Sequence, residues 1–155
     1  MSPPNALRIA VVVSRFNRSV TDSLLEGARE AAVKLGVLCD DGDIYAVPGA
    51  FELPLVAREA ARLERYGAVV CLGAVIRGET PHFEYVCHET AAGIARVAME
   101  TGKPVAFGVL TTDDAAQALE RAGGAVGNKG YEAVVTVVET LAALERVRAS
   151  GIYAL

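Results

Sequence analysis

Short runs of β-branched and other apolar residues alternate along the chain with longer runs in which apolar residues recur every three or four positions. The short runs are apolar almost throughout, as expected of strands that are buried on both faces of a sheet. Their alternation with amphipathic segments is typical of βα units, which build a parallel sheet covered by helices on both faces. The pattern therefore predicts an α/β fold, a three-layer α/β/α sandwich with four parallel strands at residues 8–14, 43–47, 68–75 and 104–110.

The first predicted helix spans residues 20–35 and ends at Gly36, because glycine readily adopts the left-handed conformation that stops a helix. Its apolar residues follow the helical period and form one inward face: Val20, Leu24, Ala28, Ala31 and Leu35. A second helix follows Pro54, and its expected inward residues are Leu55, Ala60 and Leu63. A third helix is expected at residues 83–101.

Two more helices are predicted after the fourth strand. Residues 111–114 (TTDD) offer oxygen atoms that can cap a short helix, which Gly123 and Gly124 would end. The last helix begins near Asn128 and completes the sandwich. Its residues at core spacing are Val134, Val138, Leu141, Leu144 and Val147.

Length and hydropathy narrow the class of protein. A chain of 155 residues matches a single domain with one core, so residues 1–155 are interpreted as one domain. Charged residues, glycine or proline interrupt every apolar run well before the ~18 residues that a membrane helix needs. The first residues also lack the basic and apolar pattern of a secretory signal. We therefore expect a cytoplasmic protein without a membrane span.

The cysteines and the charges argue against a disulfide-stabilised protein and against a nucleic-acid-binding protein. Cys39, Cys71 and Cys87 are odd in number and widely spaced, which predicts reduced cysteines with a structural role. The net charge is −4, and the lysines and arginines are scattered along the chain. Nucleic-acid-binding proteins usually gather these residues on one face. We therefore expect no nucleic acid among the partners.

The candidate chemistry follows the strands. In an open parallel sheet, ligands bind beyond the carboxyl ends of the strands. The segments that follow the four predicted strands are 14–17, 48–52, 75–82 and 111–112, and the third is the richest in functional groups. Gly78 and Thr80 precede a helix, where unpaired N–H groups and the helix dipole favour a bound phosphate. Thr80 could equally be a plain helix cap, with Pro81 as the first helical residue.

Two titratable residues accompany this anion site. Glu79 would repel a phosphate unless its carboxylate points to solvent, which we assume. His82 is expected one turn into the helix, and imidazole titrates near neutral pH, which suits proton transfer. A single histidine is more often a surface or packing residue, but its place at a strand end beside an anion site favours catalysis.

Other strand-end residues have two interpretations each. Phe16 could stack on a planar ring or fold back onto the core. Glu52 could contact a polyhydroxylated ligand or stabilise the first turn of a helix. Arg121 and Lys129 are the cations that a phosphate site needs, but a helical return would place Arg121 about 15 Å from the strand end. They are either solvated charges or parts of a neighbouring subunit's site.

Seven short motifs together resemble the lumazine synthase family. The resemblance covers about residues 9–144 in the family's order and spacing, so chance agreement is not a serious competitor. The motifs are SRFN at 14–17, VPGAFELP at 47–54, GAVIRGET at 73–80, HFEYVC at 82–87, FGVLTT at 107–112, ERAG at 120–123 and GNKG at 127–130.

The resemblance implies a flavodoxin-like strand order and one step of riboflavin biosynthesis. In that step, 5-amino-6-(D-ribitylamino)uracil condenses with 3,4-dihydroxy-2-butanone 4-phosphate to give 6,7-dimethyl-8-ribityllumazine, phosphate and water. The enzyme is a transferase that needs neither a metal nor another cofactor. Two alternatives are a related riboflavin synthase and a flavin- or lumazine-binding module without turnover.

The resemblance also assigns roles to residues. His82 would transfer protons, and Phe16, beside Asn17, would stack on the pyrimidine. The ribityl chain and the ring edge would contact Ala50, Phe51, Glu52, Ala74, Val75 and Ile76. The butanone phosphate would lie at Gly78, Glu79 and Thr80. A neighbouring subunit would supply Phe107, Arg121 and Lys129.

The resemblance also implies that the protein assembles into an oligomer. The family forms homopentamers, some of which build sixty-subunit icosahedral capsids that can enclose riboflavin synthase. The segment 123–127 is short, as in the shell formers. The N-terminal arm, residues 1–7, is shorter than in many shell formers, and Pro3 and Pro4 cannot donate hydrogen bonds to a sheet.

Overall fold

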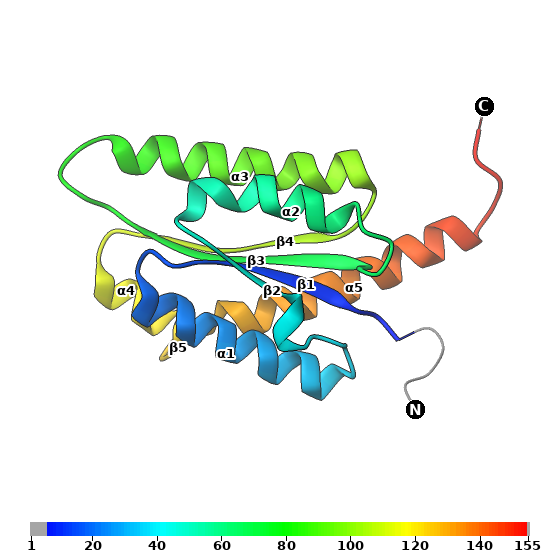
Figure 1. Cartoon of the computed structure of the whole chain (residues 1–155), viewed down its shortest axis with the longest axis horizontal. Helices are drawn as coiled ribbons and strands as arrows, with labels where there is room; N and C mark the ends of the chain where they lie inside the picture. The colour runs from blue at the N-terminus through cyan, green and yellow to red at the C-terminus, as the bar shows by residue number, and fades with distance from the viewer. Residues whose placement is uncertain (1–5, 155) are drawn as a thin grey trace.

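A four-stranded, all-parallel sheet forms the middle layer of the molecule, with the strand order β2-β1-β3-β4. The computed structural model describes residues 6–154. Helices cover both faces of the sheet, so the predicted three-layer, flavodoxin-like sandwich is confirmed (Figure 1). The strands are β1 (Ile9–Ser14), β2 (Ile44–Val47), β3 (Ala68–Ile76) and β4 (Val105–Thr112).

Two helix layers enclose two apolar cores, one on each side of the sheet. One layer contains α2 (Leu53–Ala61) and α3 (His82–Thr101), and the other contains α1 (Arg18–Leu35), α4 (Ala115–Glu120) and α5 (Lys129–Ala149) (Figure 1). Alternate residues of each strand face opposite cores, as Val11 and Val12 of β1 do. Within the described residues, no helix combines the length and apolar character that a membrane crossing requires.

All four strands lie within two residues of their predicted bounds. The largest difference is at the end of β4, which was expected to stop at Leu110. Thr111 and Thr112 continue the strand because they pair with Val75 and Ile76 of β3. The carboxyl ends of the two strands therefore extend together beyond the apolar run. Residues 1–5 of the N-terminal arm lie outside the described residues.

The predicted inward faces were partly wrong. Val20, Leu24, Ala28 and Ala31 of α1 are buried, but Leu35 at its end is exposed. Leu55 is exposed because the buried face of α2 consists of Leu53, Ala57, Ala60 and Ala61. Leu63 is exposed as well, since it lies beyond the last residue of this helix. In α5, Val134 is buried and Val147 is exposed, since the end of the helix extends past the core.

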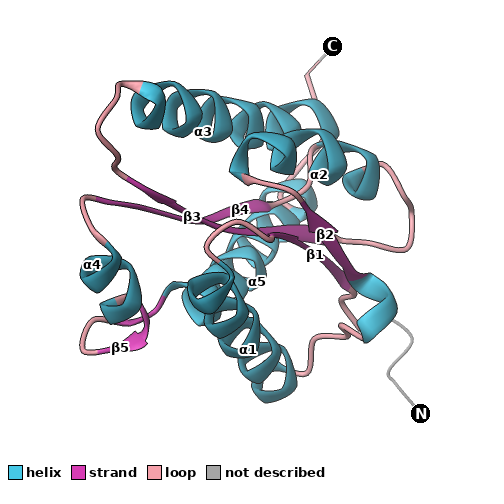
Figure 2. Ribbon diagram, turned by 60° about the vertical axis from the view of Figure 1, so that its left-hand side comes forward, coloured by secondary structure: helices cyan, strands magenta, loops and turns pink. Residues whose placement is uncertain are grey.

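A small hairpin between α4 and α5 was not predicted. The expected short helix does begin at the cap residue Asp114, whose carboxylate accepts a hydrogen bond from Gln117 N (2.8 Å). It ends at Glu120, however, and β5 (Ala122–Gly124) then pairs with β6 (Gly127–Asn128). Gly123 and Gly127 have positive φ angles of 105° and 90°, which glycine adopts readily. Figure 2 shows this turn beside α4.

The end of α1 and the start of α5 agree with the sequence signals. Gly36 ends α1 in the left-handed conformation with φ 70°. Asn128 caps α5, and its side-chain oxygen accepts hydrogen bonds from Gly130 N (2.8 Å) and Tyr131 N (3.2 Å). Capping satisfies N–H groups that have no partner within the helix. Asn128 also donates a hydrogen bond to the Ser23 carbonyl of α1 (3.0 Å), so it fixes the first turn of α5 against α1.

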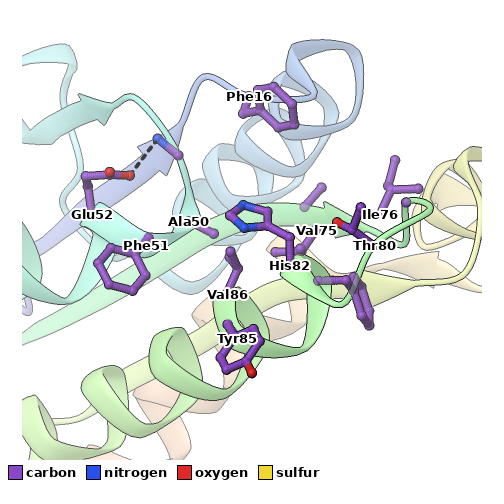
Figure 3. A pocket seen from close by; sticks show the side chains of 14 residues that line it. Phe16, Ala50, Phe51, Glu52, Val75, Ile76, Thr80, His82, Tyr85 and Val86 are labelled. Atoms are coloured by element: carbon purple, nitrogen blue, oxygen red, sulfur yellow. Dashed lines mark hydrogen bonds between the residues drawn. The ribbon is translucent and has the colours of Figure 1, made fainter.

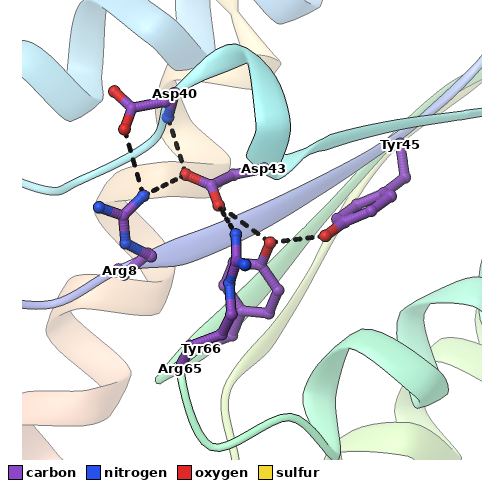
Figure 4. A network of polar contacts seen from close by, with 6 residues as sticks. All are labelled: Arg8, Asp40, Asp43, Tyr45, Arg65 and Tyr66. Atoms are coloured by element: carbon purple, nitrogen blue, oxygen red, sulfur yellow. Dashed lines mark hydrogen bonds and ion pairs between the residues drawn. The ribbon is translucent and has the colours of Figure 1, made fainter.

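The buried carboxylate of Asp43 links residues at the amino-terminal ends of the strands, away from the carboxyl ends that carry the candidate chemistry. Asp43 accepts hydrogen bonds from Arg8 (2.5 Å), Arg65 (2.6 Å) and the Tyr66 hydroxyl (2.9 Å) (Figure 4). The N–H of Asp40 is a fourth donor, at 2.8 Å. Burial raises the pKa of Asp43, but these hydrogen bonds outweigh it and lower the pKa to about 2.

This carboxylate predicts a loss of stability in acid. Because the pKa of Asp43 in the folded protein lies below its ordinary value of 3.8, its contribution is complete above about pH 4 and disappears as the pH falls toward 2. We expect a loss of about 2 kcal/mol from this group. Urea unfolding between pH 2 and pH 6 should therefore show a steeper dependence for the unchanged protein than for Asp43→Asn. The exposed Asp22, changed to asparagine, serves as a control that should leave the slope unaltered.

Candidate functional site

A cavity of about 580 Å³ opens at the carboxyl ends of β1 and β3, between the loop after β1 and the start of α3 (Figure 3). This is the location that an open parallel sheet favours for a ligand. Most of the predicted site residues line it. The lining residues are Phe16, Gly49, Ala50, Phe51, Glu52, Ala74, Val75, Ile76, Gly78, Thr80, His82, Phe83, Tyr85 and Val86.

Phe16 stands at the rim of this cavity with 71% of its surface exposed, so it does not fold back onto the core. The chain turns sharply after it because Asn17 adopts the left-handed conformation, with φ 62°. Asn17 does not line the cavity. Its side-chain amide donates a hydrogen bond to the Ala74 carbonyl (2.8 Å), which joins the ends of β1 and β3 and holds Phe16 over the opening.

The loop between β2 and α2 forms another wall. Residues Ala50–Glu52 make one 3-10 turn, and the Glu52 carboxylate accepts a hydrogen bond from Gly49 N (3.1 Å). Glu52 therefore stabilises the turn and also borders the cavity. Both interpretations of this residue are compatible. Phe51 is exposed beside it and adds an aromatic surface to the same wall.

The segment between β3 and α3 differs from the expectation in one respect. His82 is the first residue of α3 rather than a residue one turn inside it. Thr80 makes no capping hydrogen bond, and Pro81 precedes the helix with ψ near 2°, so the plain capping interpretation is wrong. Gly78 and Thr80 border the cavity, whereas Glu79 is exposed and does not line it. In Figure 3 the His82 ring projects into the cavity.

A second groove, of about 450 Å³, lies along the exposed edge strand β4. Phe107, Arg121 and Lys129 all line it, so the three residues expected to come from a neighbouring subunit lie together, whereas Asn17 and Glu79 line neither hollow. One Arg121 nitrogen donates to the Gln117 carbonyl (3.0 Å), and Lys129 pairs with Glu132 (2.9 Å). The two cations thus border a half-open groove on the last strand of the sheet.

Arg121 was expected about 15 Å from the end of the fourth strand, and the structure differs from this expectation. That estimate assumed about ten residues of helix returning along the sheet, but α4 has only 6 residues before the chain turns into the hairpin. Arg121 therefore shares its groove with Thr111 and Thr112, at the carboxyl end of β4. The separation from the first cavity has another cause, because β4 is the edge strand and the groove lies along its outer side.

The cavity at the strand ends and the groove along β4 are lined by different kinds of chemical groups. No described residue lines both, and the described lining of the first cavity includes no lysine or arginine. The first cavity holds aromatic rings, backbone groups and a histidine, and the second holds the cations. A phosphate bound near Gly78 would therefore lack a countercharge from the same subunit's groove.

The cysteines are poor candidates for nucleophiles. Burial raises the pKa of Cys71 to about 12 and that of Cys39 to about 11, so both stay protonated near neutral pH. Among residues 6–154, no cluster of histidine, cysteine, aspartate and glutamate has the composition and spacing of a metal site.

One comparison with known proteins bears on this arrangement. The family model for 6,7-dimethyl-8-ribityllumazine synthase matches residues 6–145, which include both hollows. The match covers most of the chain, including the motifs at the strand ends. Members of this family are enzymes of riboflavin synthesis that act on small-molecule substrates and in general form oligomers. The chain belongs to the lumazine synthase family.

Proposed function

We propose that the protein condenses 5-amino-6-(D-ribitylamino)uracil with 3,4-dihydroxy-2-butanone 4-phosphate, releasing phosphate and water and forming 6,7-dimethyl-8-ribityllumazine. The observation that carries the proposal is the cavity at the strand ends, where Phe16 and His82 border one space in a chain of this family. Its volume of about 580 Å³ is in the range of small-molecule sites. The enzyme would be a transferase.

The pyrimidine substrate fits the apolar half of the cavity. Phe16 offers an exposed ring face for stacking on the uracil. The ribityl hydroxyls and the ring edge would contact the walls beside it, where backbone groups at the end of β3 and in the 3-10 turn are available. The residues proposed for these contacts are Ala50, Phe51, Glu52, Ala74, Val75 and Ile76. Asn17 would act indirectly, by holding the turn that carries Phe16.

The phosphate-bearing substrate fits the other half. Its phosphate would lie at Gly78, Glu79 and Thr80, bound through backbone groups near the amino-terminal end of α3. The lining of this cavity contributes no cation, so a neighbouring subunit would supply Arg121 and Lys129, with Phe107 closing the space. The complete site would therefore form only between subunits of an oligomer.

His82 would move the protons of the reaction. The ring amine of the uracil attacks the ketone to form an imine and water, phosphate is then eliminated, and cyclisation with loss of water closes the new ring. Each step needs a proton to be added or removed, which imidazole can do near neutral pH. The His82 ring lies at the start of α3, beside the proposed phosphate site and within the same cavity.

The test of the function is a two-substrate assay. Mixing both substrates with the protein should release phosphate and form the lumazine in equal amounts. Binding of the lumazine without phosphate release would instead indicate a binding module. Formation of riboflavin from the lumazine alone would indicate a riboflavin synthase. Either result would reject the proposal.

Replacing His82 with alanine should slow the reaction without abolishing it. General acid-base catalysis typically contributes roughly 10²- to 10⁴-fold, and we expect an effect at or below the lower end because an amine, a ketone and a phosphate leaving group supply much of the reactivity themselves. Much of the remaining acceleration should come from holding the amine and the ketone together. We therefore expect a kcat lower by roughly 10-fold to 100-fold, with the Michaelis constants little changed. A kcat equal to that of the unchanged protein would contradict the role of His82.

We propose that the assembly is a homopentamer, and that the short 123–127 turn favours pentamers that build a sixty-subunit icosahedral capsid. Residues 1–155 would form a single domain, and the enzyme would be cytoplasmic. A sixty-subunit shell could enclose riboflavin synthase. Sedimentation and electron microscopy measure the particle directly. A monomer at assay concentrations would contradict the shared site as well as the pentamer.

A further inference from the structure

Arg77 connects three elements around the candidate site without lining the cavity itself. It follows β3 directly, and its backbone N–H donates a hydrogen bond to the Thr112 carbonyl (2.9 Å). Its guanidinium reaches two carboxylates on different elements. Nε donates to Asp113 in the loop after β4 (3.0 Å), and a terminal nitrogen donates to Glu84 in the first turn of α3 (2.5 Å).

The same guanidinium also packs on an aromatic ring. Its central carbon lies 4.4 Å from the ring centroid of Phe83, which is a cation–π contact. Phe83 is buried and lines the cavity. Arg77 therefore contacts the two residues that directly follow His82 in α3. Through Asp113 it ties this turn to the loop after β4.

Arg77 is the main source of polar side-chain contacts between this turn and the end of β4. Within the described residues, no other side-chain hydrogen bond or ion pair connects residues 77–84 with β4 or the loop that follows it. Thr80 gives no capping hydrogen bond, and nothing lies within 4 Å of the position that a Gly78 Cβ would occupy. Besides the packing of the buried Phe83, the fork of Arg77 thus supplies the polar side-chain contacts that tie this turn to the loop after β4.

We infer that Arg77 is a positioning residue, which holds the first turn of α3 so that His82 meets the reacting atoms. The inference rests on the proposed function. Arg77 is about half-exposed, and exposed ion pairs contribute little to global stability. Its main effect is therefore on the geometry of the site, where displacement of a catalytic group by about 1 Å can cost up to 10²-fold in rate.

Substitution of Arg77 tests this inference through His82. We expect Arg77→Ala to lower kcat by roughly 10-fold while leaving the Michaelis constant for the butanone phosphate within about twofold. In a protein that already carries His82→Ala, the same change should have almost no further effect, because the two residues act through one step. Arg77→Lys should restore only part of kcat, since one ammonium group cannot reproduce the planar fork.

A matched control is Arg62→Ala, which removes an exposed arginine paired with Glu59 far from the cavity and should leave kcat unchanged. Amide hydrogen exchange gives a second reading that does not depend on activity. Exchange in residues 78–86 should be faster in Arg77→Ala than in the control.

Three results would overturn the inference: an unchanged kcat in Arg77→Ala, an equal loss of kcat in the presence and absence of His82, or unchanged hydrogen exchange in residues 78–86. Failure of the proposed function is distinguishable from these results. It would appear as a lack of lumazine formation by the unchanged protein. Hydrogen exchange would then still decide whether Arg77 holds the turn.

Discussion

Arg121→Ala should raise the Michaelis constant for 3,4-dihydroxy-2-butanone 4-phosphate by roughly 100-fold. Charge-assisted hydrogen bonds to a phosphate contribute about 1.5–3 kcal/mol, and the cavity of the other subunit offers no lysine or arginine within its described lining, so only Lys129 of the same groove would remain. The Michaelis constant for the ribitylaminouracil should change little, because that substrate carries no phosphate. Steady-state kinetics with each substrate varied in turn measure both values.

Arg121→Lys separates charge from shape in this prediction. The lysine keeps the positive charge but loses the planar fork that can bind two phosphate oxygens, so an intermediate Michaelis constant is expected. Arg62→Ala again serves as a control for the loss of an exposed arginine. If Arg121→Ala leaves the Michaelis constant for the butanone phosphate unchanged, or weakens both substrates equally, Arg121 does not bind the phosphate.

Gly130→Ala should cause the largest loss of stability of any single methyl addition proposed here. Gly130 is buried in the first turn of α5, where that helix meets α1. A Cβ atom at this position would meet the Leu24 carbonyl oxygen at 1.9 Å and its carbon at 2.7 Å. Both are backbone atoms, so the helices would have to separate. Overpacking usually costs about 1–3 kcal/mol, and this contact belongs at or above the upper end.

The separation would also expose part of the core. Leu24 is fully buried against the sheet, and Val134 one turn along α5 is buried beside it. We therefore expect Gly130→Ala to shift the urea midpoint strongly or to prevent folding. Gly42→Ala is the matched control, because nothing lies within 4 Å of its added Cβ and its φ angle is not positive. Equal midpoints for the two variants would contradict the close contact of α1 and α5.

The strands and the layer order could be predicted because they depend on short-range patterns. Apolar runs such as Val11 to Val13 identify strands buried on both faces, and Gly36 marks a helix end from its own conformational freedom. The location of the cavity followed from a general rule about parallel sheets rather than from any single motif. The resemblance to a family, and not the pattern, identified the substrates.

Other features depended on tertiary contacts that a pattern does not contain. The phase of α2 is set by the packing of Leu53, and the sequence alone favoured Leu55. The short α4 and the hairpin after it bring Arg121 into the same groove as Thr112, which no helical period predicts. Arg77 was missed because its partners, Asp113 and Glu84, come from two other elements.

We propose that each site combines the His82 cavity of one subunit with the Arg121 groove of its neighbour. Mixed oligomers test it most directly. One parent carries Phe16→Ala and His82→Ala, the other carries Arg121→Ala, and the two are co-expressed with different tags and purified through both. In randomly mixed rings, about a quarter of the interfaces would unite two intact halves. For a shared site, lumazine formation should recover to about that fraction of the unchanged protein's activity. Activity no higher than the mean of the two parents, in oligomers verified to contain both chains, would contradict it.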